Sequence, residues 1–167
     1  MNAPKTEYEK KLFHAKRQLD AWIAENVMNY KWVAHYPDEE GEETAFRFLV
    51  SNEVYEKKEW FDESDGTERI PEEDYYMYVP NYCWSIKECK KILEKLRDQD
   101  GDYCEADITL GHGAWHCHIW NNQSKFRSLA SAEHMETAIT LAVKTFKLGL
   151  MTSTQLTDDY DKIVGGE

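Results

Sequence analysis

The chain has 167 residues, 41% of them hydrophobic and 13% aromatic, which suits one folded domain and argues against a disordered protein. Its formal net charge of −12 argues against direct binding of nucleic acid and favours a basic partner. No apolar run approaches the length of a membrane span, and none follows the charges of MNAPKTEYEKK, so we expect a cytoplasmic protein without a membrane partner.

Amphipathic periodicity predicts the first helix over residues 5–30, where apolar residues recur at three- and four-residue spacing. Residues 31–43 are expected to lead through aromatic positions into an acidic loop. Residues 44–61, TAFRFLVSNEVYEKKEWF, have the β-branched and aromatic content of a strand. Alternation would place three of their side chains on one face: Phe46, Phe48 and Val50.

Residues 38–74 hold nearly all of the excess charge, with 15 Asp or Glu against four Lys or Arg. Over the rest of the chain, 17 acids and 16 bases almost cancel. We expect residues 38–74 to form an acidic, β-hairpin-like insertion with Asp65-Gly66 at the tip of a turn. Residues 71–82, PEEDYYMYVPNY, would follow as a second strand or an extended arm.

The second half of the chain has clearer boundaries. Ser85 and Glu88 form a capping box, which predicts a helix over residues 85–97. CEADITL and WHCHIW read as two strands of a hairpin joined across GHGA, and NNQSKFRSLA as a third strand or a return. A last helix is expected over residues 131–148, ended by Gly149, with residues 151–167 as a polar, loose tail.

The stretch HGAWHCHIW, residues 112–120, raises the question of a metal site. On a strand, Trp115, Cys117 and Ile119 would face the helices, and the histidines and Trp120 the opposite side. His116 and His118 supply two ligands, whereas zinc needs three or four from the protein. We therefore expect no metal, and keep a metalloenzyme built on these two histidines as an alternative.

The remaining signals for enzymatic chemistry are weak. The four cysteines have no CxxC spacing and are expected to be reduced thiols, several of them buried. Cys117 is more consistent with a core residue than with a nucleophile. Phosphate-loop, dinucleotide and nucleophile-elbow motifs are absent from the sequence. The sequence thus favours a non-enzymatic protein with no catalytic residue and no cofactor.

Three stretches together resemble the phage ABA-sandwich domain of small bacteriophage and prophage proteins. They are LDAWIAENVMNYKW (19–32), VPNYCWSIKECKKILEKL (79–96) and DYCEADITLGHGAWHCHIWNNQSKFRSLASAEHMETAITLAVKTF (102–146). The resemblance implies a viral origin, action in the cytoplasm of a bacterial host, and one α/β sandwich domain over residues 1–150. Its fold class would be α+β, with about three helices packed on a largely antiparallel sheet. The family supplies no catalytic residues, and residues 38–74 are longer and more acidic than its usual link.

From these features we expect a small phage protein that binds and inhibits or modulates a host protein, one of the host's defence proteins being the favoured target. Its acidic, aromatic-rich segment would meet a basic surface on that protein. The expected contact residues are Trp60, Phe61, Asp62, Glu63, Asp65, Glu72, Glu73, Asp74, Tyr75 and Tyr76. An alternative interpretation is a solvated hairpin whose acids confer solubility and whose aromatic side chains pack inward.

A second functional alternative is a sponge that sequesters a nucleotide-type immune signal, in a pocket that a homo-oligomer would complete at its subunit interface. Cationic side chains would meet the phosphate and an indole would stack on the base. The candidates are Arg97, Lys125 and Arg127 for the phosphate, and Trp84 or Trp120 for the base.

Overall fold

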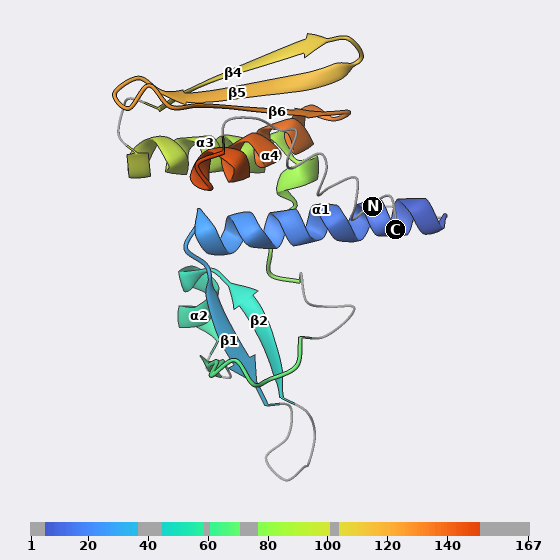
Figure 1. Cartoon of the computed structure of the whole chain (residues 1–167). Coiled ribbons are helices and arrows are strands. Elements are labelled where there is room, and N and C mark those ends of the chain that lie inside the picture. Colours follow the sequence, from blue (N-terminus) through green and yellow to red (C-terminus); the bar gives the residue numbers. More distant parts are fainter. Residues whose placement is uncertain (1–5, 37–44, 59–60, 71–76, 101–103, 151–167) are drawn as a thin grey trace. The chain divides into compact units, whose positions relative to one another are not determined.

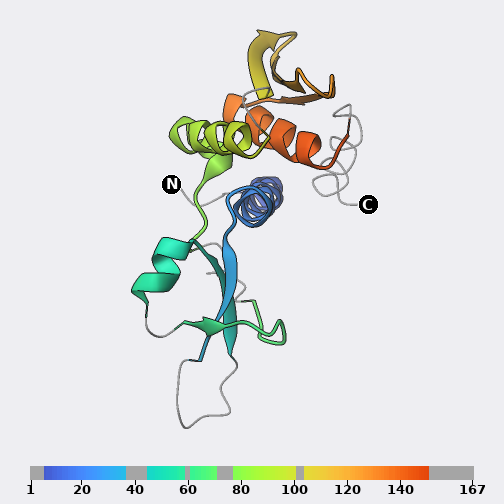
Figure 2. The same ribbon diagram turned by 90° about the vertical axis from the view of Figure 1, so that its left-hand side faces the viewer.

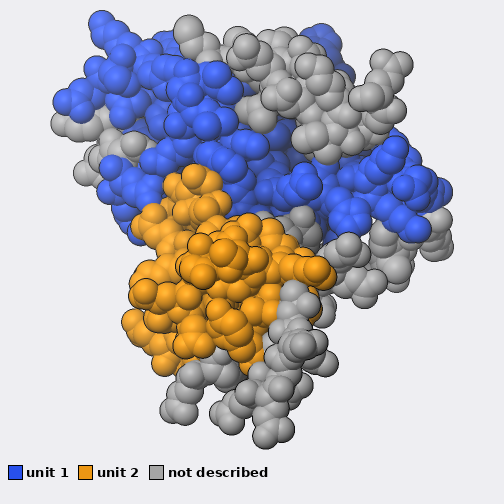
Figure 3. Space-filling model, turned by 60° about the horizontal axis from the view of Figure 1, so that its bottom comes forward, with its two compact units in different colours: residues 1–23, 81–167 blue, residues 24–80 orange. Residues whose placement is uncertain are grey.

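The structure is a computed structural model that describes residues 6–36, 45–58, 61–70, 77–100 and 104–150. Within these residues it has four α-helices and two antiparallel three-stranded sheets, which confirms the α+β class. The chain falls into two compact units, residues 1–23 with 81–167 (unit 1) and residues 24–80 (unit 2), as Figure 3 shows. A domain can contain more than one compact unit, so the single domain over 1–150 stays a prediction.

Unit 1 is built in layers. Helices α3 (Ile86–Asp100) and α4 (Met135–Lys147) cover one face of a sheet with strand order β4-β5-β6 (Figures 1 and 2). The strands are Cys104–Gly111, Ala114–Asn121 and Arg127–Ala132. Helix α1 (Glu7–Asn26) begins in this unit, and a short 3-10 helix, η1 (Tyr82–Trp84), lies between it and α4.

Local sequence signals explain most of unit 1. The Ser85 hydroxyl accepts a hydrogen bond from the Glu88 amide at 3.4 Å, which confirms the N-cap. The predicted hairpin is present, and so is the third strand. On the face of β5 that is turned toward the helices, the side chains have the predicted register: Cys117 and Ile119 are fully buried, and Trp115 is half-buried. Helix α4 ends at Lys147, where Gly149 adopts a φ of +69° and donates to the Phe146 carbonyl.

Unit 2 contains a smaller sheet of order β2-β1-β3, formed by Phe46–Val50, Lys31–His35 and Asp62–Glu63. All pairings between these strands are antiparallel. The core of the unit is a cluster of four buried side chains, with Phe46, Val54, Tyr55 and Tyr78 packed against it. The four are Val33, Phe48, Val50 and Phe61. This cluster confirms that Phe46, Phe48 and Val50 share one face.

Several predicted boundaries were wrong. Helix α1 ends at Asn26, because Asn29 turns the chain with a φ of +59°, and residues 31–35, for which no element was predicted, form strand β1. Residues 52–57, predicted as strand, form the short helix α2 (Asn52–Lys57) with Ser51 as its N-cap. Helix α4 begins four residues later than predicted because β6 runs on to Ala132.

Candidate functional site

The histidine-rich hairpin is shaped by its two-residue turn. His112 and Gly113 have φ values of +52° and +82°, and Gly111 pairs with Ala114 across the turn. Positive φ at both central residues is the type I′ geometry that matches the twist of a β-hairpin. His112 therefore occupies the turn itself, as the sequence predicted.

Both ring nitrogens of His116 already have partners. Nδ1 lies 2.7 Å from the Ser131 hydroxyl, and Nε2 lies 3.0 Å from the Gly111 carbonyl. Because the carbonyl can only accept, Nε2 carries a proton and donates to it, while Nδ1 and the hydroxyl share the second hydrogen bond. The ring thus ties β5 to the end of β4 and to β6, which is a structural role.

His118 is exposed on the same outer face of the sheet. Among the residues that the structure describes, no three His, Cys, Asp or Glu side chains are grouped so as to hold a metal ion. To bind a metal through Nδ1, His116 would have to give up its hydrogen bond with the Ser131 hydroxyl.

Part of the acidic segment can be placed in unit 2. Asp62 and Glu63 form the edge strand β3, which pairs with β1, and both side chains are exposed. Asp65 is exposed in the following turn, where its carboxylate accepts hydrogen bonds from the Thr67 amide at 2.8 Å and the Thr67 hydroxyl at 2.6 Å. These bonds lower the pKa of Asp65 below its ordinary value, so it stays ionised.

The buried carboxylate of Glu68 holds that turn through hydrogen bonds. Only 8% of Glu68 is exposed, and its carboxylate accepts from the Ser64 hydroxyl at 2.7 Å and from the amides of Asp65 and Gly66 at 3.3 and 3.2 Å. The Ser64 hydrogen bond contributes most to lowering its pKa. Gly66, the predicted tip, has a φ of +89°. The exposed acids therefore stand on a backbone held in one conformation.

The remaining residues predicted to contact a partner are placed as follows. Phe61 is 6% exposed and belongs to the core cluster of unit 2, where its ring meets Phe48 and Tyr78 at centroid distances of 6.2 and 5.6 Å. Its side chain is thus turned inward, away from any partner. The others lie outside the described residues: Trp60, Glu72, Glu73, Asp74, Tyr75 and Tyr76.

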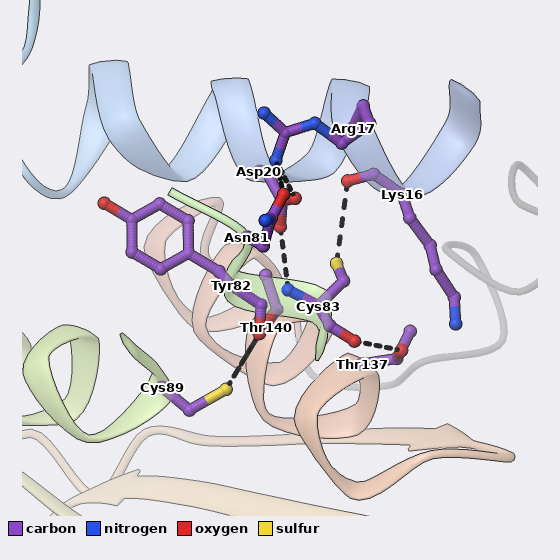
Figure 4. Close-up of polar contacts among 9 residues, drawn as sticks. All are labelled: Lys16, Arg17, Asp20, Asn81, Tyr82, Cys83, Cys89, Thr137 and Thr140. Carbon is purple, nitrogen blue, oxygen red and sulfur yellow. Dashed lines mark hydrogen bonds and ion pairs between the residues drawn. The ribbon is translucent and has the colours of Figure 1, made fainter. Parts of the chain in front are cut away.

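A buried ionic network in unit 1 has no counterpart in the sequence-based predictions (Figure 4). Asp20, which is fully buried, accepts from the Arg17 guanidinium at 2.7 Å and from the Cys83 amide at 2.8 Å. The same guanidinium nitrogen lies 2.7 Å from the Asn81 side-chain oxygen. Burial raises the pKa of Asp20 to about 6, against these hydrogen bonds. The network fastens η1 to α1.

Lys16, the residue before Arg17, is buried as well, with only 4% of it exposed. Its amine lies 5.3 Å from the centre of the Trp84 ring. Burial lowers the pKa of this amine. Arg17 and Asp20 are three residues apart, a spacing that faces side chains along a helix, but nothing in the sequence indicates that both are buried.

The cysteines are free thiols, and three of the four are buried, as predicted. Burial raises the pKa of Cys89 and of Cys117 to about 12, and raises that of Cys83 well above its ordinary value. A thiol with so high a pKa is protonated at neutral pH and is a poor nucleophile. Cys117 therefore acts as a core residue.

The side chains proposed to hold a nucleotide lie in three places. Trp84 packs against Phe13, with ring centroids 5.6 Å apart, and Arg97 is exposed on α3. Lys125 is exposed in the turn between β5 and β6. Only Trp120 and Arg127 come together, as directly paired residues on β5 and β6.

No protein-family model matches the chain, and no curated protein matches it. Among solved structures, the chain is similar to a phage protein from Bacillus cereus ATCC 14579, known from a 2.0 Å crystal structure. The two share 16% sequence identity over 90% of this chain and 93% of that chain, with a TM-score of 0.43. A likeness of this size carries no argument about function.

No helix in the described part of the chain combines the length and the apolar character needed to cross a bilayer.

Proposed function

We propose that the chain is a small bacteriophage protein without catalytic activity that binds a bacterial host protein through the acidic face of unit 2. Inhibition or modulation of a host defence protein is the biological role that fits such binding. The resemblance to the phage ABA-sandwich domain motivates the viral origin. The observation that carries the binding proposal is the exposure of three carboxylates on β3 and in its turn: Asp62, Glu63 and Asp65.

Two features support these acids as a binding surface. The hydrogen bonds of Glu68 hold the backbone of the turn, so that backbone loses little conformational freedom when a partner binds. Two basic side chains of this unit have contacts of their own: the Arg47 guanidinium lies 4.7 Å from the centre of the Trp32 ring and close to Gly66 of the turn, and Lys57 pairs with Glu53. Residues 38–74 hold 15 acids against four bases, so the field around them is negative, which suits a basic groove.

Affinity pulldown from a bacterial host, followed by surface plasmon resonance against the recovered protein, tests the proposal. The test variant is Asp62→Asn/Glu63→Gln/Asp65→Asn, which keeps the side-chain shapes and the acceptor that Asp65 offers to Thr67. Opposite charges steer association, so the association rate should fall roughly tenfold at low salt, and less as salt rises, because the Debye length falls from about 10 Å at 0.1 M to about 3 Å at 1 M.

The matched control removes the same formal charge from unit 1, with Glu7→Gln/Glu94→Gln/Asp98→Asn on exposed helical positions. This control should leave the association rate nearly unchanged if the location of the charge matters. Equal rates for the test variant and the wild type would refute the acidic face as the binding surface. If both triple variants slowed association equally, the effect would come from net charge alone and the position of the charges would not matter.

A further inference from the structure

The outer face of the β4-β5-β6 sheet, turned away from α3 and α4, carries polar and aromatic side chains. No described helix or strand covers it (Figures 1 and 2). The strand register aligns these side chains in rows of three across β4, β5 and β6. Two of the rows are Glu105–Trp120–Arg127 and Asp107–His118–Leu129.

A hollow of about 360 Å³ opens on this face. Its lining includes Asp107 and Thr109 of β4, His118 and Trp120 of β5, and Arg127 of β6. Trp120 is half-buried, whereas the other four are exposed. The volume lies within the range of about 300–1,000 Å³ that is usual for small-ligand sites.

Charge is separated across this hollow. The acidic side chains stand on β4 and the cation of Arg127 on β6, two strand spacings away, or roughly 9–10 Å. The indole of Trp120 and the imidazole of His118 lie on the strand between them. A complementary ligand has an anionic group at one end, hydrogen-bond donors at the other, and a flat apolar surface in the middle.

The geometry points to a binding site for a purine mononucleotide. The base stacks on Trp120, the phosphate accepts hydrogen bonds from the planar fork of Arg127, and amino or imino groups of the base donate to Asp107. Repulsion by Asp107 keeps the phosphate at the β6 side. The His118 imidazole, on the strand next to Arg127, is within reach of the same ligand.

The ligand is a single nucleotide and not a nucleic acid strand. Among the described residues that line the hollow, Arg127 is the one cation. Asp107 lines it from β4, and Glu105 lies two residues before Asp107 on the same strand, paired with Trp120. A strand would bring several phosphates to a face with one cation and two carboxylates, on a chain of net charge −12. Glu105 is in addition held by a hydrogen bond from the Asn122 side chain.

Isothermal titration calorimetry of the full chain with GMP, AMP, guanosine and inorganic phosphate tests this site. We expect GMP or AMP to bind with a dissociation constant of about 1 mM or tighter, and guanosine and inorganic phosphate each to bind at least tenfold more weakly, because each keeps only part of the contacts. Trp120→Ala should weaken mononucleotide binding by roughly tenfold or more, as expected for the loss of one stacked base.

Two charge variants locate the phosphate. Arg127→Gln should weaken GMP or AMP by roughly tenfold and leave guanosine unchanged, since guanosine has no phosphate. Lys125→Gln, in the neighbouring turn, removes the same charge outside the hollow and should bind like the wild type. Melting curves followed by circular dichroism confirm that each variant is folded.

Absence of heat with both mononucleotides at millimolar concentration would overturn the proposal. So would unchanged affinity in a folded Trp120→Ala, or equal losses in Arg127→Gln and Lys125→Gln. If Trp120→Ala abolished capture of a host protein while no mononucleotide bound, the face would belong to a protein partner instead. The mononucleotide titrations need no host protein and use variants of unit 1, so their failure leaves the proposal for the acidic face of unit 2 unaffected.

Discussion

Replacing Asp20 with Ala should cost more stability than any other single removal of a charge among the described residues. The substitution removes the acceptor of the Cys83 amide and the counter-charge of Arg17, which is 5% exposed. An unsatisfied buried donor costs about 1–3 kcal/mol, and a buried ion pair that loses one partner costs about 3–5 kcal/mol. The two estimates overlap, so we expect about 3–5 kcal/mol in total.

Urea unfolding at pH 7, followed by circular dichroism, measures this loss. The control is Asp98→Ala, because Asp98 pairs with Arg97 at 3.8 Å with both side chains exposed, and that change should cost less than about 0.5 kcal/mol. Replacing both charges, in Arg17→Met/Asp20→Leu, should recover part of the loss since no unpaired ion remains. A loss below about 1 kcal/mol in Asp20→Ala would refute the network as a stabilising connection between α1 and η1.

Three further predictions concern titration, packing and reactivity. Because burial raises the pKa of Asp20 to about 6 from 3.8, its protonated form stabilises the fold below about pH 4 and this contribution is lost as pH rises through 6. At about 1.36 kcal/mol per pH unit the loss is about 3 kcal/mol. The unfolding free energy of the wild type minus that of Asp20→Asn should therefore fall by about this amount between about pH 3 and pH 7, and a constant difference would contradict it. Phe61→Ala should destabilise the chain in urea by about 3–5 kcal/mol through the cavity left among Phe48 and Tyr78, whereas a loss under about 1 kcal/mol would mean that the ring is not core. In the folded protein at pH 7, a thiol reagent should modify the partly exposed Cys104 fastest. Rapid modification of Cys83, Cys89 and Cys117 without urea would contradict their burial.

Local patterns in the sequence predicted the elements whose signals are themselves local. The Ser85 cap, the alternation of residues 114–121 and the glycine that ends α4 each depend on residues close in the chain, and each was confirmed. The failures have an equally physical cause. Helix α2 has strand-like neighbours and depends on one cap, Ser51, and β1 is a strand because residues 46–50 return to pair with it.

The buried network could not have been predicted because its partners are 63 and 64 residues apart. Asp20 lies in an amphipathic helix, where an acidic side chain is normally on the solvent-exposed face. Only the approach of η1 supplies the Cys83 amide that makes burial of this carboxylate tolerable. Glu68 is a different case: its partners Ser64, Asp65 and Gly66 are two to four residues away, but only the folded turn brings them to its carboxylate.

Residues 61–63 show why charge should dominate the recognition proposed for unit 2. Phe61 points into the core, and the next two residues, Asp62 and Glu63, point to solvent. The described part of this segment thus offers a partner carboxylates rather than an aromatic anchor. Fixed surface charges govern the rate of association and its response to salt, whereas buried aromatic anchors govern dissociation. A Trp60→Ala variant that speeds dissociation, combined with the charge variants that slow association, would therefore divide the segment into an anchor and a steering surface, and unchanged dissociation would leave steering as its whole contribution.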